Sequence, residues 1–95
     1  MSDSAARSYL QWIHTLACIV RGHGSPCSGY VTAHHVRRFG SARDHWRAVP
    51  LCVAHHLHDF GPDCIERGKR RFEERFGIDL EAIIVRLNAE YEACS

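Results

Sequence analysis

Cysteine and histidine residues are concentrated in the middle of this chain, and this concentration constrains its fold more than any other feature. The 95 residues include five Cys and eight His, and residues 18–58 hold three of these cysteines and seven of these histidines. A chain of this length forms one small domain, residues 1–95, which needs either a well-packed core or added stabilisation from disulfides, a metal ion or a partner chain. The odd number of cysteines and the absence of a secretory signal at the start predict a cytoplasmic protein that binds metal through its thiols.

Hydrophobic periodicity predicts a small α+β fold. Apolar residues recur at helical spacing in the first and last thirds of the chain, and β-branched residues cluster in its middle. Gly77 is expected to end one helix, and Asp79 to cap the start of the next. No apolar run is long enough to span a membrane, so we expect no membrane partner. The predicted elements are helix 5–17, strand 30–36, strand 48–52, helix 53–60, helix 63–76 and a last helix from residue 79.

One group of residues offers the donor set of a structural zinc site. Cys52 and His55 lie three positions apart where a predicted strand turns into a helix, so both can bind one ion. Cys18 and Cys27 lie upstream, on either side of a glycine-rich stretch. His23 lies between them and is the alternative to Cys27 as a ligand. The competing interpretation is that the cysteines are small buried hydrophobic residues.

A second group contains two pairs of adjacent histidines. His34 and His35 end the first predicted strand, and neighbouring side chains on a strand point to opposite faces. His34 can therefore bind a second ion together with His56, while His35 accepts a proton from water. The competing interpretation is a set of surface histidines or hydrogen-bonded core histidines.

Three sequence motifs, in this order, resemble those of the HNH endonucleases. They are AHHVRR at residues 33–38, VPLCVAHH at residues 49–56 and FGID at residues 76–79. The similarity covers roughly residues 8–90 and is strongest to the phage and prophage subgroup associated with recombination functions. The resemblance implies a ββα-metal (His-Me finger) core, stapled by zinc and flanked by N-terminal and C-terminal helices.

The resemblance also implies roles for individual residues. His35 would be the general base, and His34 and His56 would bind the catalytic cation. That cation would be Mg²⁺, Mn²⁺, Ni²⁺ or Zn²⁺. The zinc ligands would include Cys18, Cys52 and His55. The family's middle Asn is absent, and Asp44 or His45 stands in its region, where the Asp44 carboxylate can cap the loop backbone. His58 is a further candidate ligand of the catalytic cation.

Arginine dominates the cations of this chain. Eleven of the twelve basic residues are Arg, although the net charge is only +1. Arginine favours bidentate contacts with phosphate, which suits a DNA backbone. The expected DNA contacts are Arg37, Arg38, Arg43 and Arg47 near the histidines, and a helical stripe of Arg67, Arg71 and Arg75. For the stripe, the alternative is a solvated helix face paired with glutamates.

These features predict a metal-dependent DNA endonuclease of low sequence specificity. A chain this small is expected to nick DNA unless it forms a homodimer or works with phage recombination proteins in a bacterial host cell. The alternative function is a non-catalytic zinc module that binds nucleic acid or protein. Such a module would need the cysteines but would have no use for His35 as a base.

Overall fold

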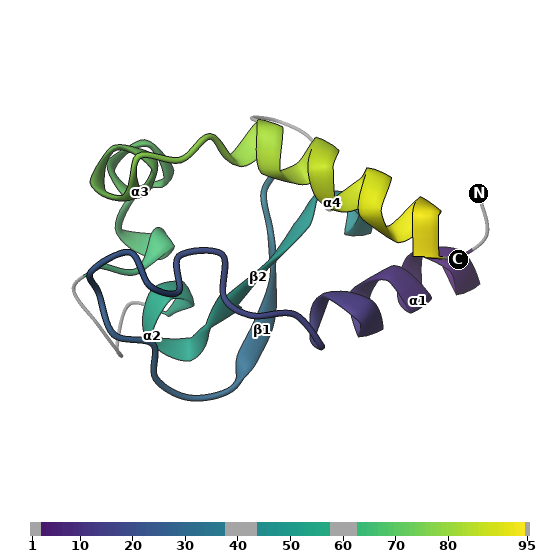
Figure 1. The fold of residues 1–95 in the computed structure, drawn as a ribbon, viewed down its shortest axis with the longest axis horizontal. Helices are drawn as coiled ribbons and strands as arrows, with labels where there is room; N and C mark the ends of the chain where they lie inside the picture. Colours follow the sequence, from purple (N-terminus) through teal and green to yellow (C-terminus); the bar gives the residue numbers. More distant parts are fainter. Residues whose placement is uncertain (1–2, 38–43, 58–62, 95) are drawn as a thin grey trace.

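A two-stranded antiparallel sheet lies at the centre of the computed structural model, which describes residues 3–37, 44–57 and 63–94 (Figure 1). Strand β1 (Val31–His35) pairs with strand β2 (Ala48–Cys52), with Val31 opposite Cys52 and His35 opposite Ala48. All five residues of β2 are buried, whereas those of β1 are half-buried. Both strands agree with the predicted ranges to within one residue, and the predicted α+β class is confirmed.

Short helical turns flank strand β2 on both sides. The 3₁₀ helix η1 (His45–Arg47) leads into β2, and α2 (Val53–His56) follows it without an intervening loop. The sequence of elements is therefore strand, turn, strand and helix, and the antiparallel register brings the start of β1 and the end of β2 close to the first turn of α2. Of the predicted helix 53–60, the structure describes this short α2, and residues 58–62 lie outside the described residues.

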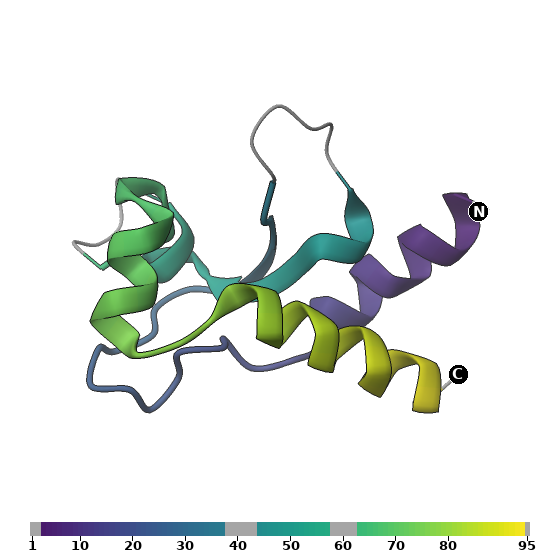
Figure 2. The ribbon, with the colours of Figure 1, turned by 90° about the horizontal axis from the view of Figure 1, so that it is seen from above.

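Helices α1 (Asp3–Ile13) and α4 (Leu80–Cys94) pack against the sheet at the end of the molecule where both termini lie (Figures 1 and 2). The core between them contains Tyr9, Leu51 and Leu80, which are fully buried. The Tyr9 ring contacts those of Trp12, Trp46 and Tyr91, with centroids 4.9 to 5.8 Å apart. Asn88 of α4 donates to the Tyr9 hydroxyl at 3.1 Å and to the Trp46 carbonyl at 2.9 Å. These contacts fix the flanking helices to the segment that enters β2.

Two of the predicted helices differ from the structure. The first ends at Ile13 rather than at residue 17, because the backbone turns to i→i−3 hydrogen bonds at Thr15 and Leu16. The predicted helix 63–76 is two elements, η3 (Ile65–Arg67) and α3 (Lys69–Phe76), and Gly68 separates them with a φ of 141°. That backbone conformation is open to glycine and interrupts the helix.

Helix ends at the other predicted positions are confirmed. Gly77 ends α3 in the left-handed conformation, with a φ of 64°. Asp79 Oδ1 accepts hydrogen bonds from the backbone N–H groups of Glu81 (3.0 Å) and Ala82 (3.3 Å), which caps α4. No helix within the described ranges is long and apolar enough to cross a membrane.

Candidate metal centres

The first candidate centre gathers three thiols and one imidazole at one point. The ligand atoms of Cys18, Cys27, Cys52 and His55 all lie within 4.8 Å of one another. His55 Nδ1 lies 3.0 Å from Sγ of Cys52, 3.7 Å from Sγ of Cys18 and 3.8 Å from Sγ of Cys27. Tetrahedral zinc, with bonds of about 2.0–2.3 Å, separates its donor atoms by about 3.5–3.8 Å. The cluster therefore has the donor set of a structural zinc site and could hold the ion, and two of its three distances from His55 Nδ1 fall within this range.

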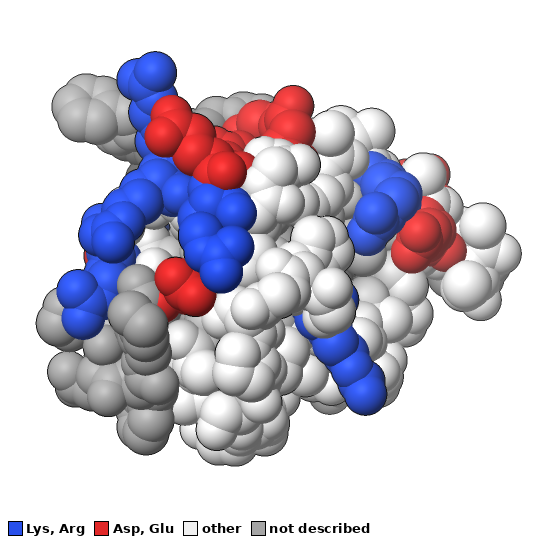
Figure 3. Space-filling model, turned by 60° about the vertical axis from the view of Figure 1, so that its left-hand side comes forward, with Lys and Arg blue, Asp and Glu red and all other residues white. Residues whose placement is uncertain are grey.

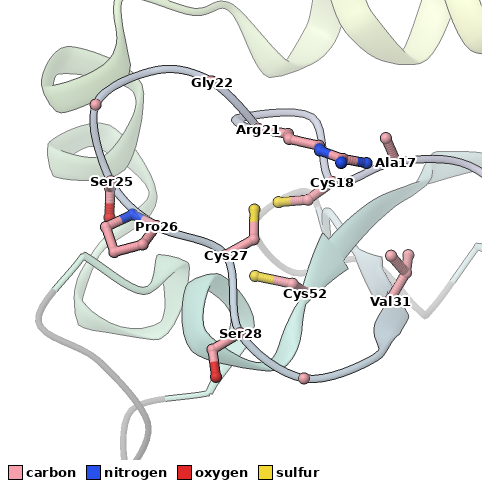
Figure 4. A pocket seen from close by; sticks show the side chains of 12 residues that line it. Ala17, Cys18, Arg21, Gly22, Ser25, Pro26, Cys27, Ser28, Val31 and Cys52 are labelled. Carbon is pink, nitrogen blue, oxygen red and sulfur yellow. The ribbon is translucent and has the colours of Figure 1, made fainter.

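Three segments far apart in the sequence bring these ligands together. Cys18 follows the turns after α1, Cys27 lies in the loop before β1, and Cys52 and His55 lie at the junction of β2 and α2. Figure 4 shows the three cysteine side chains beside the cavity between this loop and the strand. Gly29 lets the loop approach α2, because a Cβ there would lie 2.9 Å from Cβ of Val53.

The pKa values of the three clustered cysteines shift in different directions. Burial raises the pKa of Cys18, and burial together with the neighbouring Cys18 raises the pKa of Cys27 to about 12. Burial acts to raise the pKa of Cys52 too, but backbone hydrogen bonds from Ser28 and His55, together with side-chain hydrogen bonds from Cys27 and Cys18, outweigh it and lower that pKa. The raised pKa values keep Cys18 and Cys27 protonated near pH 7, and a bound divalent cation would be needed to hold all three groups together as thiolates. Binding of zinc at this cluster would therefore release protons.

Ser25 supports the imidazole of this cluster from its far side. Its Oγ lies 3.0 Å from His55 Nε2, while His55 Nδ1 faces the sulfur atoms. A second hydrogen bond to a ligating imidazole fixes the orientation of the ring. The predicted alternative ligand, His23, lies elsewhere: its ring packs 6.5 Å from that of Phe76, and Cys27 completes the cluster.

The second candidate centre is the pair formed by His34 and His56. Their ring centroids lie 4.8 Å apart with the planes at 74°. Burial, followed by the neighbouring His56 and His35, lowers the pKa of His34 to about 4. Burial also lowers the pKa of His56, although Glu66 acts in the opposite direction. Both imidazoles are therefore neutral near pH 7, which is the form that binds metal ions.

His35 lies on the other face of β1, as strand alternation predicts. Its Nε2 lies 2.9 Å from Nδ1 of His45, and the two ring centroids are 5.1 Å apart. Asp44 Oδ1 accepts a hydrogen bond from the Trp46 backbone N–H at 3.0 Å and caps η1. Asp44 therefore caps the turn that leads into β2, and His45 is the residue that contacts His35.

Arg47 requires a correction, because it was expected to contact DNA. It is only 7% exposed, and its Nε donates to the Val36 carbonyl at 2.9 Å. Both of its terminal nitrogens pair with the carboxylate of Glu81 in α4. This bidentate pair, in which Arg47 is buried and Glu81 is half-exposed, joins the start of β2 to α4 and occupies both terminal nitrogens of the guanidinium. The partner lies 34 residues further along the chain, so local sequence patterns could not reveal the pair.

The other basic residues gather mostly at α3. Arg67 belongs to η3 and not to α3, yet it lines one small cavity together with Arg71 and Arg75. Arg75 pairs with Asp63 at 3.6 Å. Figure 3 shows Lys and Arg side chains gathered on the side of the molecule that carries α3, with Asp and Glu among them. Arg37 is exposed after β1, whereas Arg38, Arg43 and His58 lie outside the described residues.

Comparison with known proteins places the chain in a family. Neither the curated proteins nor the solved structures give a match. A family model does match, and it covers residues 2–93, which is almost the whole chain. The chain therefore belongs to the family described as "Protein of unknown function (DUF968)".

Proposed function

We propose that this protein is a metal-dependent DNA endonuclease of the HNH type. The observation that carries the proposal is that the two adjacent histidines of β1 point to opposite faces of the strand and contact different partners. His34 meets His56 on one face, with ring centroids 4.8 Å apart, while His35 on the other face meets His45. Strand β1, strand β2 and α2 would then form the ββα-metal core that the sequence motifs predict. A zinc site built from the cysteines and His55 would staple that core.

The proposed chemistry divides between the two faces of β1. His34 and His56 would hold the catalytic cation, and two protein ligands leave most of its coordination sphere open to water and phosphate oxygens. When bound, the cation stabilises charge on the phosphate and on the leaving oxygen. His35 would accept the proton of the attacking water, while the 2.9 Å contact with His45 holds its ring in place.

The basic surface supports DNA as the substrate. Arg67 and Arg71 are exposed at the η3 and α3 end, and Arg37 is exposed directly after β1. Backbone contacts of this kind position a duplex without reading its bases, so we expect nicking of low sequence specificity. The proposed setting is the cytoplasm of a bacterial host, for a protein of phage or prophage origin.

Plasmid nicking tests this proposal. Supercoiled plasmid incubated with the zinc-loaded protein should be nicked in the presence of Mg²⁺, Mn²⁺ or Ni²⁺. His35→Ala should lower the nicking rate by about 10²–10⁴-fold, because it removes the proton acceptor and no ligand. Added metal should not rescue it, whereas it should partly rescue His34→Ala. His23→Ala is the matched control, since His23 belongs to neither histidine pair, and it should nick at the wild-type rate.

The second candidate function is a non-catalytic zinc module. The observation in its favour is that the cysteine cluster contains four ligands without any contribution from His34, His35 or His56. A wild-type protein that binds zinc and DNA but nicks no plasmid with any divalent ion would favour this function. If the His35→Ala variant nicks plasmid at the wild-type rate, His35 is not the general base.

A further inference from the structure

The hydroxyl group of Thr32 connects strand β1 to the imidazole of His56. Thr32 lies two residues before His34, so both side chains project from the same face of β1. Its Oγ1 lies 2.7 Å from the backbone carbonyl oxygen of Leu51, its partner residue on β2. The same Oγ1 lies 2.6 Å from Nδ1 of His56. One hydroxyl therefore makes two short hydrogen bonds, one to the sheet and one to a candidate metal ligand.

Counting protons settles the direction of both hydrogen bonds. A threonine hydroxyl has a single proton to donate, and a carbonyl oxygen can only accept. The Thr32 hydroxyl therefore donates to the Leu51 oxygen and accepts from His56, so the proton between Thr32 and His56 belongs to Nδ1. A neutral His56 then carries its lone pair on Nε2. Because Nδ1 is engaged, Nε2 is the nitrogen of His56 that remains for an ion.

We propose that Thr32 is the positioning residue of the catalytic cation site, acting through His56. It holds the imidazole in the Nδ1–H tautomer and turns Nε2 toward the ion that His34 shares. That this ion takes part in the cleavage of DNA rests on the proposed function. The tautomer of His56 follows from the two hydrogen bonds of Thr32 alone. An outer hydrogen bond of this kind changes metal affinity by about 10–100-fold.

The competing explanation is that Thr32 is present only as a β-branched strand residue. Thr32→Val separates the two explanations, because valine keeps the branched shape and loses the hydroxyl. Thr32→Ser keeps the hydroxyl and loses the methyl group. Thr15→Val is the matched control, because the Thr15 hydroxyl also donates to a backbone carbonyl, that of Trp12 at 2.6 Å, and contacts neither metal centre.

Two measurements on the zinc-loaded protein test the role of Thr32. Two-bond ¹⁵N–¹H NMR correlations report the tautomer of His56, and calorimetric titration with Mn²⁺ or Ni²⁺ reports the affinity of the second site. We expect the Nδ1–H tautomer in the wild type and in Thr32→Ser. Thr32→Val should lose the fixed tautomer and about 10–100-fold in affinity, while Thr15→Val should match the wild type.

Several outcomes would overturn the proposal. The wild-type tautomer is measured in the unaltered protein, so an Nε2–H tautomer there contradicts it even if Thr32→Val does not fold. Wild-type affinity in a folded Thr32→Val, or equal losses in Thr32→Val and Thr32→Ser, also contradicts it. If the zinc-loaded wild type binds no second ion at His34 and His56, Thr32 has no role in positioning a metal ligand. If affinity depends on the hydroxyl but no plasmid is nicked, Thr32 keeps its role and the nuclease function fails.

Discussion

The two candidate metal centres lie at the same strand–helix junction but differ in how complete they are. The cysteine cluster supplies four ligands from three segments, and Cys18, Cys52 and His55 are buried. The histidine pair supplies two ligands, both half-buried, from β1 and α2. Structural zinc sites are closed by protein ligands, whereas catalytic ions keep open positions. Adjacent residues, His55 and His56, thus belong to a closed cluster that could hold a structural zinc and to an open pair that the proposed function assigns to a catalytic ion.

Removing a ligand of the closed centre should have the largest effect. Cys52→Ala should abolish zinc binding and folding together, since apparent zinc binding contributes free energy on the order of 10 kcal/mol to such sites. Zinc content per chain and the far-ultraviolet circular dichroism spectrum measure both losses. Cys94→Ala, at an exposed cysteine of α4 outside the cluster, is the control and should keep wild-type zinc and fold. A Cys52→Ala variant as stable as the wild type would contradict the assignment of a structural zinc site to this cluster.

Acid should lower the free energy of unfolding through the half-buried imidazole of His34. The pKa of His34 is about 4 in the folded chain, against an ordinary value of 6.5, so the unfolded chain binds more protons between these pH values. The free energy of unfolding is therefore retained above pH 6.5 and lost as the pH falls toward 4. At pH 5 we expect a loss of about 1–2 kcal/mol relative to pH 7.

His34→Gln isolates this contribution. Both proteins have the same cysteine cluster, so zinc loss at low pH affects them equally and the difference between them reports on His34. Urea unfolding at pH 7 and pH 5, without added divalent ions, should show the smaller acid-induced loss in His34→Gln. Equal losses in the two proteins would contradict the lowered pKa.

An effect of similar size concerns the support of the closed centre. Ser25→Ala should weaken zinc binding by about 10–100-fold, because the His55 ring loses its hydrogen bond on the far side. The protein should still fold when zinc is in excess. Competition with a chromophoric chelator measures the affinity, and Ser28→Ala, in the same loop, serves as the control. Equal affinities for the two variants would show that Ser25 does not orient His55.

Local patterns in the sequence predicted most of both centres. Cys52 and His55 could be assigned from their spacing of three, and the opposite directions of His34 and His35 follow from strand alternation. Asp79 and Gly77 mark helix ends by their own chemistry. The pairing of Arg47 with Glu81 could not be predicted, because it depends on how α4 packs beside β2. The supporting hydroxyls of Ser25 and Thr32 were also missed, since a hydroxyl has no sequence pattern until its partner is placed.

Brief treatment with a mild chelator tests most directly whether the closed and open centres have different roles. The zinc-loaded protein is dialysed against the chelator, and zinc per chain and plasmid nicking are then measured before and after Mg²⁺ or Mn²⁺ is returned. We expect one zinc per chain to remain, nicking to be lost, and nicking to return with the added ion. Nicking that persists without any added divalent ion, or that tracks the zinc content instead, would contradict the division into a structural and a catalytic centre.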